Sequence, residues 1–298
     1  MHVSIRDATL QAGGFESIRQ GLTALGISAV ELSVGRDYQV TAVVPTPGRP
    51  TLPIETDDDV EELRRHLEDA GVTVPAFLLS NDFGREDLDR EIAWVTRVVE
   101  AAGALQIPVV RIDALMRLPA APPDPGQARE AHLERFATAV RRILDATPDA
   151  PVDLGIENHG VQGNDPAFLE GLLDRAADPR LGLTLDTGNF YWSGLPLVEV
   201  YEVLARFAPQ TRHTHVKNIG YPPSERDRRR EPGWRYEDFV CPLEEGDIDL
   251  LRVRDLLRDA GYDHDLCLED ESLGRFRPEE RQAVLRRDVE YLQRLVGS

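Results

Sequence analysis

The chain has few cysteines and no long apolar runs, and its basic residues are outnumbered by acidic ones. Its 298 residues include only two cysteines, Cys241 and Cys267, which are too few for a disulfide framework. No stretch approaches the roughly 18 apolar residues that a membrane-spanning helix requires. The first residues, MHVSIRDATL, lack the basic flank and apolar core of a signal peptide. These absences predict a reduced, cytoplasmic protein that does not contact a membrane.

The charge balance is strongly acidic. The sequence has 34 Lys and Arg against 53 Asp and Glu, which gives a formal net charge of −19. A field of this sign repels phosphate backbones and anionic membranes, so nucleic acid is excluded as an expected partner. The 41% of hydrophobic residues supplies material for a substantial core.

Strand-like and helix-like patterns alternate along the whole chain. The expected strands are His2–Ile5, Ala29–Ser33, Val74–Leu79, Pro108–Ile112, Val152–Glu157, Gly182–Asp186, His213–Lys217 and Asp265–Glu269. The expected helices, with apolar residues three and four apart, are Gly14–Leu25, Asp57–Ala70, Glu86–Ala102, Ala128–Leu144, Pro166–Ala176, Leu197–Phe207, Leu250–Ala260 and Pro278–Val296. Eight strand–helix units predict a (β/α)8 TIM barrel, in a single domain spanning residues 1–298. A doubly wound open sheet uses similar units and is the alternative.

Two connections are long, at residues 35–56 and 218–249, and both follow the carboxyl end of a strand. Barrel active sites are built from such loops, so we expect them to form walls or a lid. The second contains an arginine-rich segment at 224–235, for which a contact between subunits is the alternative.

Four of the expected strands end in a potential metal ligand. They are LGIENHG, LGLTLDTGN, RHTHVKN and DLCLEDES, which supply Glu157, Asp186, His215 and Glu269. Each residue alone has another reading, such as a helix cap, a salt bridge or a core hydrogen bond. Four ligands on successive strands predict one divalent cation at the mouth of a barrel. Three carboxylates with one imidazole favour Mn²⁺, with Mg²⁺, Co²⁺ and Zn²⁺ as alternatives.

Strand alternation places further polar residues near these ligands. His213 and Lys217 share the face of His215, so we expect His213 to support His215 from below and Lys217 to project toward the mouth. His159 projects in the same way from the face of Glu157. Lys217 is expected either to donate to a substrate oxygen or to form an ion pair.

Four more residues complete the expected substrate pocket. Glu31 and Arg111 end two strands and line the pocket or pair with each other. Asn189 either binds a sugar hydroxyl or caps a helix. Trp192 either stacks on a sugar face or packs across a subunit contact.

The strand-end motifs resemble those of the xylose-isomerase-like superfamily of sugar isomerases and epimerases. The matching segments are IENH at 156–159, DTGN at 186–189, HVKN at 215–218 and LED at 268–270, together with LEEGDID at 243–249. The resemblance covers nearly the whole chain. It implies a metal-dependent enzyme that acts on a small carbohydrate-like substrate, in a homo-oligomer that is a dimer or tetramer.

The resemblance also implies catalytic roles. In ketose epimerases of this superfamily, the fifth- and eighth-strand glutamates exchange the substrate proton, which assigns Glu157 and Glu269 as the acid/base pair. The expected reaction is sugar isomerisation or epimerisation through a metal-stabilised enediolate.

Three positions depart from the pattern of ketose 3-epimerases. Gly163, Asn189 and Tyr221 stand where those enzymes carry glutamate, histidine and arginine. The alternative reaction is therefore a metal-dependent lyase or dehydratase acting on a keto-sugar or keto-inositol. An apurinic endonuclease, which shares this barrel, needs further histidine and acidic ligands, and a binding barrel without catalysis is the last alternative.

Overall fold

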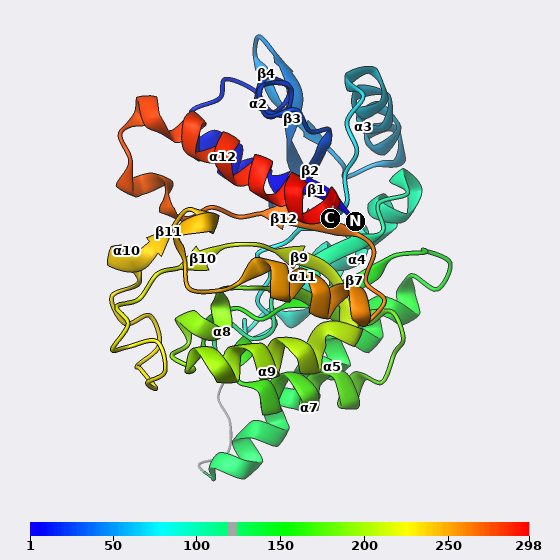
Figure 1. The fold of residues 1–298 in the computed structure, drawn as a ribbon. Helices are drawn as coiled ribbons and strands as arrows, with labels where there is room; N and C mark the ends of the chain where they lie inside the picture. The colour runs from blue at the N-terminus through cyan, green and yellow to red at the C-terminus, as the bar shows by residue number, and fades with distance from the viewer. Residues whose placement is uncertain (119–123, 298) are drawn as a thin grey trace.

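Eight parallel strands form a ring that is surrounded by helices in the computed structural model, which describes residues 1–118 and 124–297 (Figure 1). The strands are β1 (His2–Arg6), β2 (Ala29–Ser33), β5 (Ala76–Leu78), β6 (Val109–Ile112), β7 (Asp153–Glu157), β8 (Leu181–Asp186), β9 (Thr211–His215) and β12 (Asp265–Leu268). They pair in the order β12-β1-β2-β5-β6-β7-β8-β9. A parallel bridge between Val216 and Leu268 joins the two ends of this sheet. The predicted (β/α)8 barrel is confirmed.

One long helix follows each barrel strand. These helices are α2 (Ile18–Leu25), α3 (Asp57–Ala70), α4 (Leu88–Leu105), α5 (Pro125–Ala146), α7 (Pro166–Ala176), α9 (Leu197–Phe207), α11 (Leu250–Asp259) and α12 (Pro278–Gly297). Short helices α1 (Asp7–Ala12), α6 (Gly160–Gly163), α8 (Asn189–Trp192) and α10 (Tyr236–Phe239) lie in the connections. Asp87, Asp124, Asp165 and Asp249 each cap the start of a long helix with a side-chain oxygen. Part of the acidic surplus therefore satisfies helix N-termini, where negative charge is favourable.

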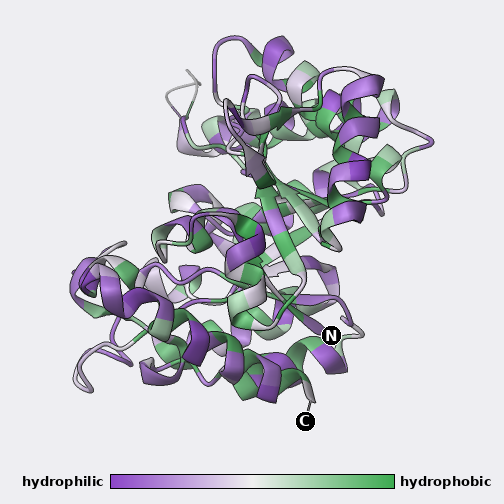
Figure 2. Cartoon of the chain, turned by 90° about the horizontal axis from the view of Figure 1, so that it is seen from above, coloured by the Kyte–Doolittle hydropathy of each residue, from purple (hydrophilic) through white to green (hydrophobic). Residues whose placement is uncertain are grey.

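The core lies inside the ring and between the ring and its helices. In Figure 2 the central strands are largely coloured as hydrophobic, and hydrophilic residues are more frequent along the helices. The ring also encloses buried polar side chains, including Ser4, Glu31, His213 and Asp265. None of the described helices is both long and apolar enough to cross a lipid bilayer.

The connection at 35–56, expected as a loop, contains a hairpin. Strands β3 (Gln39–Thr46) and β4 (Arg49–Pro53) pair antiparallel and pack against α3. Val40 and Leu52 lie opposite each other in this ladder, and both are buried. Gly48 makes the turn at φ 77°, a backbone conformation that favours glycine. The alternation of apolar and polar residues around this glycine is the signal that could have predicted the hairpin.

Two carboxyl groups meet where α12 packs beside the end of β12. Asp288 and Asp270 hydrogen-bond to each other through their side chains, and both are buried. Apart from this contact between the two carboxyl groups, neither Oδ2 atom has a hydrogen-bond partner among the residues that the structure describes. Burial and the neighbouring Asp270 raise the pKa of Asp288 to about 8. One proton shared by the two carboxyl groups therefore stabilises this contact.

We expect the stability of the protein to fall as pH rises through about 8. The pKa of an aspartate in an unfolded chain is about 3.9. Between about pH 3.9 and the folded-state pKa of about 8, the folded protein therefore holds a proton that the unfolded chain has lost. The stabilisation is complete at low pH and is lost when Asp288 ionises in the folded state. Asp288→Asn should therefore lose less melting temperature between pH 6 and pH 9 than the wild type. Asp259→Asn, at an exposed position on α11, is the control. Equal losses in Asp288→Asn and wild type would contradict the shared proton.

Candidate metal centre

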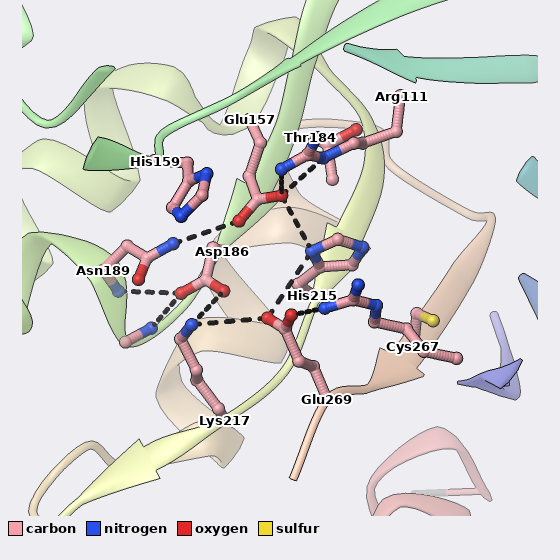
Figure 3. Close-up of polar contacts among 12 residues, drawn as sticks. Arg111, Glu157, His159, Thr184, Asp186, Asn189, His215, Lys217, Cys267 and Glu269 are labelled. Atoms are coloured by element: carbon pink, nitrogen blue, oxygen red, sulfur yellow. Dashed lines mark hydrogen bonds and ion pairs between the residues drawn. The ribbon is translucent and has the colours of Figure 1, made fainter. Parts of the chain in front are cut away.

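The four predicted ligands converge at one end of the ring. Glu157, Asp186 and His215 are the last residues of β7, β8 and β9, and Glu269 directly follows β12. One ligand atom from each residue lies within 4.8 Å of all the others. Their side chains point toward one another (Figure 3). All four residues are at most 4% exposed, so the cluster is buried as well as compact.

The orientation of His215 leaves one ring nitrogen for a cation. Its Nε2 atom lies 3.0 Å from both carboxylate oxygens of Glu31. Because an ionised carboxylate only accepts hydrogen bonds, Nε2 donates to Glu31, and Nδ1 is the ring nitrogen that is left to face a cation. That Nδ1 atom faces Glu157 Oε2 at 3.2 Å and Glu269 Oε2 at 3.6 Å.

Two atoms of the cluster lack the hydrogen bonds that buried polar atoms normally make. Among the described residues, His215 Nδ1 and Asp186 Oδ2 have no hydrogen-bond partner. The other oxygen of Asp186 is occupied, because Oδ1 accepts from the backbone N–H groups of Gly188 at 2.8 Å and Asn189 at 2.7 Å. A divalent cation would supply both atoms with the partner that hydrogen bonds do not give them. The residues present therefore fit the expected ion, and the mixed oxygen and nitrogen donors suit Mn²⁺, Mg²⁺ or Zn²⁺.

A row of buried, hydrogen-bonded side chains supports His215 from inside the ring, on the side away from the other ligands. Glu31 joins His215 to His213, whose Nε2 lies 3.0 Å from Glu31 Oε1, and His213 Nδ1 lies 2.9 Å from Asp265 Oδ1. Burial would raise the pKa of Glu31, but the two histidines lower it well below its usual range. His213, two residues before His215 on β9, thus contacts His215 through Glu31. Glu31 lies below the ligands, between the two histidines, whereas we expected it on the wall of the pocket.

Two arginines neutralise the two glutamates. Arg111 Nε lies 2.5 Å from Glu157 Oε2, and its Nη2 lies 3.0 Å from Asp113 Oδ1. Burial would raise the pKa of Glu157, but Arg111 and His215 hold it well below its usual value. Arg6, the last residue of β1, forms an ion pair with Glu269. Arg6 was not among the predicted residues, although it ends its strand as the ligands do.

Lys217 reaches into the cluster between two ligands. Its Nζ atom lies 3.2 Å from Asp186 Oδ2, 3.3 Å from Glu269 Oε2 and 3.3 Å from Glu271 Oε1. Burial would lower the pKa of Lys217, but the carboxylates of Asp186 and Glu271 raise it above its usual value. Lys217 is therefore an ammonium held among ion pairs. Glu271 was also absent from the prediction, although it lies only two residues beyond a ligand.

Asn189 and His159 lie beside the ligand cluster, on the same side as Glu157. Asn189 Nδ2 donates to Glu157 Oε1 at 3.1 Å. His159 Nδ1 lies 2.9 Å from Asp113 Oδ1, and its side chain is 44% exposed. The hydrogen bond to Asp113 raises the pKa of His159 despite partial burial. His159 thus offers a donor with a raised pKa that solvent can reach.

The connection at 218–249 lies over one end of the ring, and α8 lies at that same end (Figure 1). Strands β10 (Asn218–Ile219) and β11 (Val240–Cys241) pair antiparallel at its base. Arg230 lies between the rings of Tyr191, at 4.6 Å, and Tyr221, at 4.2 Å, and donates to the carbonyl groups of Tyr191 and Leu195. Arg230, in the arginine-rich segment 224–235, therefore fixes this connection to the barrel.

Trp192 lies apart from the ligands, on the wall of a neighbouring pocket. This pocket has a volume of about 460 Å³ and is lined by Trp192, Gly233, Arg235, Tyr236, Glu237 and Asp238. Tyr236 connects the pocket to the cluster, because its hydroxyl donates to Glu271. Of the predicted substrate residues, Arg111, Asn189 and Lys217 contact the ligands. His159 contacts Asp113, the partner of Arg111, and Trp192 adjoins the pocket.

Comparison with known proteins identifies the family. The model of the xylose isomerase-like TIM barrel family matches residues 21–295. The chain belongs to this family. A curated relative, an uncharacterized protein of Methanocaldococcus jannaschii, is 25% identical over 168 residues. That match covers 54% of this chain and half of the length of the relative.

Solved structures share the fold over nearly the full chain. The IolI protein, solved with a bound zinc atom, has a TM-score of 0.68 and 15% identity, covering 100% of this chain and 98% of its own. An L-ribulose 3-epimerase has a TM-score of 0.65 and 15% identity, covering 100% of this chain and 95% of its own. The mannonate dehydratase of Streptococcus suis has a TM-score of 0.62 and 17% identity, covering 99% of this chain and 92% of its own. At these identities the likeness shows a common fold.

We expect Glu31→Gln to weaken the binding of Mn²⁺ by about 10- to 100-fold, because hydrogen bonds to a ligating histidine orient it and raise its basicity. Isothermal titration of chelator-stripped protein measures this change. Glu91→Gln is the matched control, because Glu91 is also buried and paired with an arginine, Arg36. Unchanged affinity in Glu31→Gln, or an equal loss in Glu91→Gln, would contradict the role of Glu31.

Proposed function

We propose that this protein is a divalent-metal-dependent isomerase or epimerase of a keto-sugar, which works by proton abstraction next to a carbonyl group and forms an enediolate. The observation that carries this proposal is the cluster of Glu157, Asp186, His215 and Glu269, in which two buried atoms lack hydrogen bonds. Membership in the xylose isomerase-like family supports it. Mn²⁺ is the proposed ion, because carboxylate and imidazole ligands both suit it.

A bound cation would polarise the substrate carbonyl and stabilise the negative charge of the enediolate. The protein itself supplies two carboxylates that flank His215, those of Glu157 and Glu269. In the proposed reaction one carboxylate removes a proton from the substrate carbon and the other returns a proton. Arg111 and Arg6 pair with these two carboxylates and fix them in place, which orients them for proton transfer.

Charged donors beside the ligands would orient the substrate oxygens. Lys217 and His159 lie on the two sides of the cluster, and both have raised pKa values, which favours their charged forms. Hydrogen bonds from charged donors are stronger than those from neutral ones, so these groups would bind sugar hydroxyl or carbonyl oxygens. Trp192 would contact the part of the substrate that extends into the neighbouring pocket.

A dehydratase or lyase acting on a keto-sugar or keto-inositol is the second candidate. Eliminating water requires an acid that protonates the leaving hydroxyl. His159, which Asp113 holds toward its protonated form at a solvent-accessible position, is the observation that favours this reaction. The two candidates share the same cation and carboxylates, and they differ in whether a hydroxyl group leaves.

Metal removal and isotope exchange test the proposed function together. Protein stripped with a chelator should lose turnover of keto-sugars and regain it with Mn²⁺. In deuterated water, an isomerase or epimerase should place deuterium on the substrate carbon without a loss of mass equivalent to water. A product lighter by one water would favour the dehydratase. Full activity after complete removal of metal would contradict both candidates.

We expect Glu269→Gln to lose at least about 100-fold in turnover, because an amide cannot exchange the substrate proton. Its circular dichroism spectrum should match that of the wild type. Glu290→Gln is the control, because Glu290 is exposed on the outer side of α12. A Glu269→Gln enzyme with near-normal turnover would contradict the acid/base assignment.

A further inference from the structure

Lys217 shares its partners with the proposed cation. Its ammonium group lies 3.2 Å from Asp186 Oδ2 and 3.3 Å from Glu269 Oε2, and both residues belong to the ligand cluster. Figure 3 shows the lysine side chain between these two carboxylates. Asp186 Oδ2 is also the oxygen that the backbone leaves unpaired. A cation bound through this oxygen would meet the ammonium group at the same position.

The third partner of Lys217 lies outside the ligand cluster. Glu271 Oε1 is 3.3 Å from Lys217 Nζ, and Glu271 Oε2 accepts a hydrogen bond from the Tyr236 hydroxyl. Tyr236 belongs to α10, in the connection that covers this end of the ring. The carboxylate of Glu271 is therefore held from two sides, by the lysine and by the covering connection.

We propose that Lys217 competes with the divalent cation for Asp186 and Glu269, and that Glu271, held by Tyr236, is a positioning residue that retains the ammonium group when the cation binds. This proposal rests on the cation site of the proposed function. Lys217 is only 4% exposed, so its charge needs a partner inside the protein. When Asp186 and Glu269 turn to the cation, Glu271 is the carboxylate that still compensates this charge.

The arrangement has a consequence for substrate binding. An ammonium group retained by Glu271 stays beside the cation, where it can donate to a substrate oxygen. Without Glu271 the ammonium group would remain on Asp186 and Glu269, and it would repel the incoming ion. The Tyr236–Glu271 hydrogen bond thereby couples the covering connection to the occupancy of the metal centre.

A double-mutant cycle on metal affinity tests the proposal without a substrate. Mn²⁺ is titrated calorimetrically into chelator-stripped wild type, Glu271→Gln, Lys217→Met and the double variant. Glu271→Gln should bind Mn²⁺ about tenfold more weakly than wild type. Lys217→Met should bind it more tightly than wild type, because the competing charge is gone. In the Lys217→Met background, Glu271→Gln should change the affinity by about twofold or less, since the lysine it would hold is absent.

Two further variants sharpen the cycle. Tyr236→Phe changes only the covering connection and should weaken Mn²⁺ binding in the same direction as Glu271→Gln, by a smaller factor. Asp227→Asn, at an exposed position of the same connection outside the pocket, is the control and should leave the affinity unchanged. Circular dichroism checks that each variant is folded, and Tyr236→Phe keeps the test available if Lys217→Met does not fold.

An equal loss from Glu271→Gln in both backgrounds would overturn the proposal, because Glu271 would then act on the cation directly. Looser or unchanged binding in Lys217→Met would also overturn it, as would an unchanged affinity in Tyr236→Phe. A wild type that binds no Mn²⁺ would overturn both this proposal and the proposed function. If the Mn²⁺ affinities follow the predicted pattern but the protein turns over no keto-sugar, only the proposed function would be overturned.

Discussion

The crowding of negative charge at one end of the barrel is the constraint on which the site depends. Glu157, Asp186 and Glu269 are buried within a few ångströms of one another, and three carboxylates in such a place repel strongly. Arg111, Arg6 and Lys217 each pair with one or two of them. These cations allow the acidic cluster to exist inside a folded protein, where unpaired charge would be costly.

The barrel itself places these charges together. In a closed parallel sheet the carboxyl ends of all strands meet at one rim, so residues distant in sequence become neighbours. The register of β8 and β9 sets Asp186 directly beside His215. Below this rim, Glu31, His213 and Asp265 continue the polar layer through the ring. Above it, Arg230 and its two tyrosines anchor the connection that carries Tyr236. The fold thus supplies support on one side of the ligands and cover on the other.

The elements that follow directly from local patterns could be predicted from the sequence. Short apolar runs that end in an acid or a histidine identified the strands of Glu157, Asp186, His215 and Glu269. The parallel ring then follows, because each run alternates with an amphipathic helix. The β3–β4 hairpin was missed because the length and proline content of its segment favoured a loop, although Gly48 marks a turn.

The partners of the ligands depend on contacts that local patterns do not encode. Arg6 reaches Glu269 only because β1 pairs with β12, across most of the chain. Glu31 lies two residues before the end of β2, and that depth places it under His215 instead of at the rim. Glu271 shows its role only through Tyr236, which arrives from a connection with little regular structure. Strand pairing, the depth of a residue along its strand and the path of a connection are therefore the three features that the sequence did not reveal and the structure did.

The most direct test of the central claim is anomalous diffraction from crystals of the protein grown with Mn²⁺. Data collected at the manganese absorption edge locate the ion independently of any assumption about function. The account predicts one strong peak in contact with His215 Nδ1, Asp186 Oδ2 and the carboxylates of Glu157 and Glu269. A peak at another site, or no peak at a saturating concentration of Mn²⁺, would contradict it.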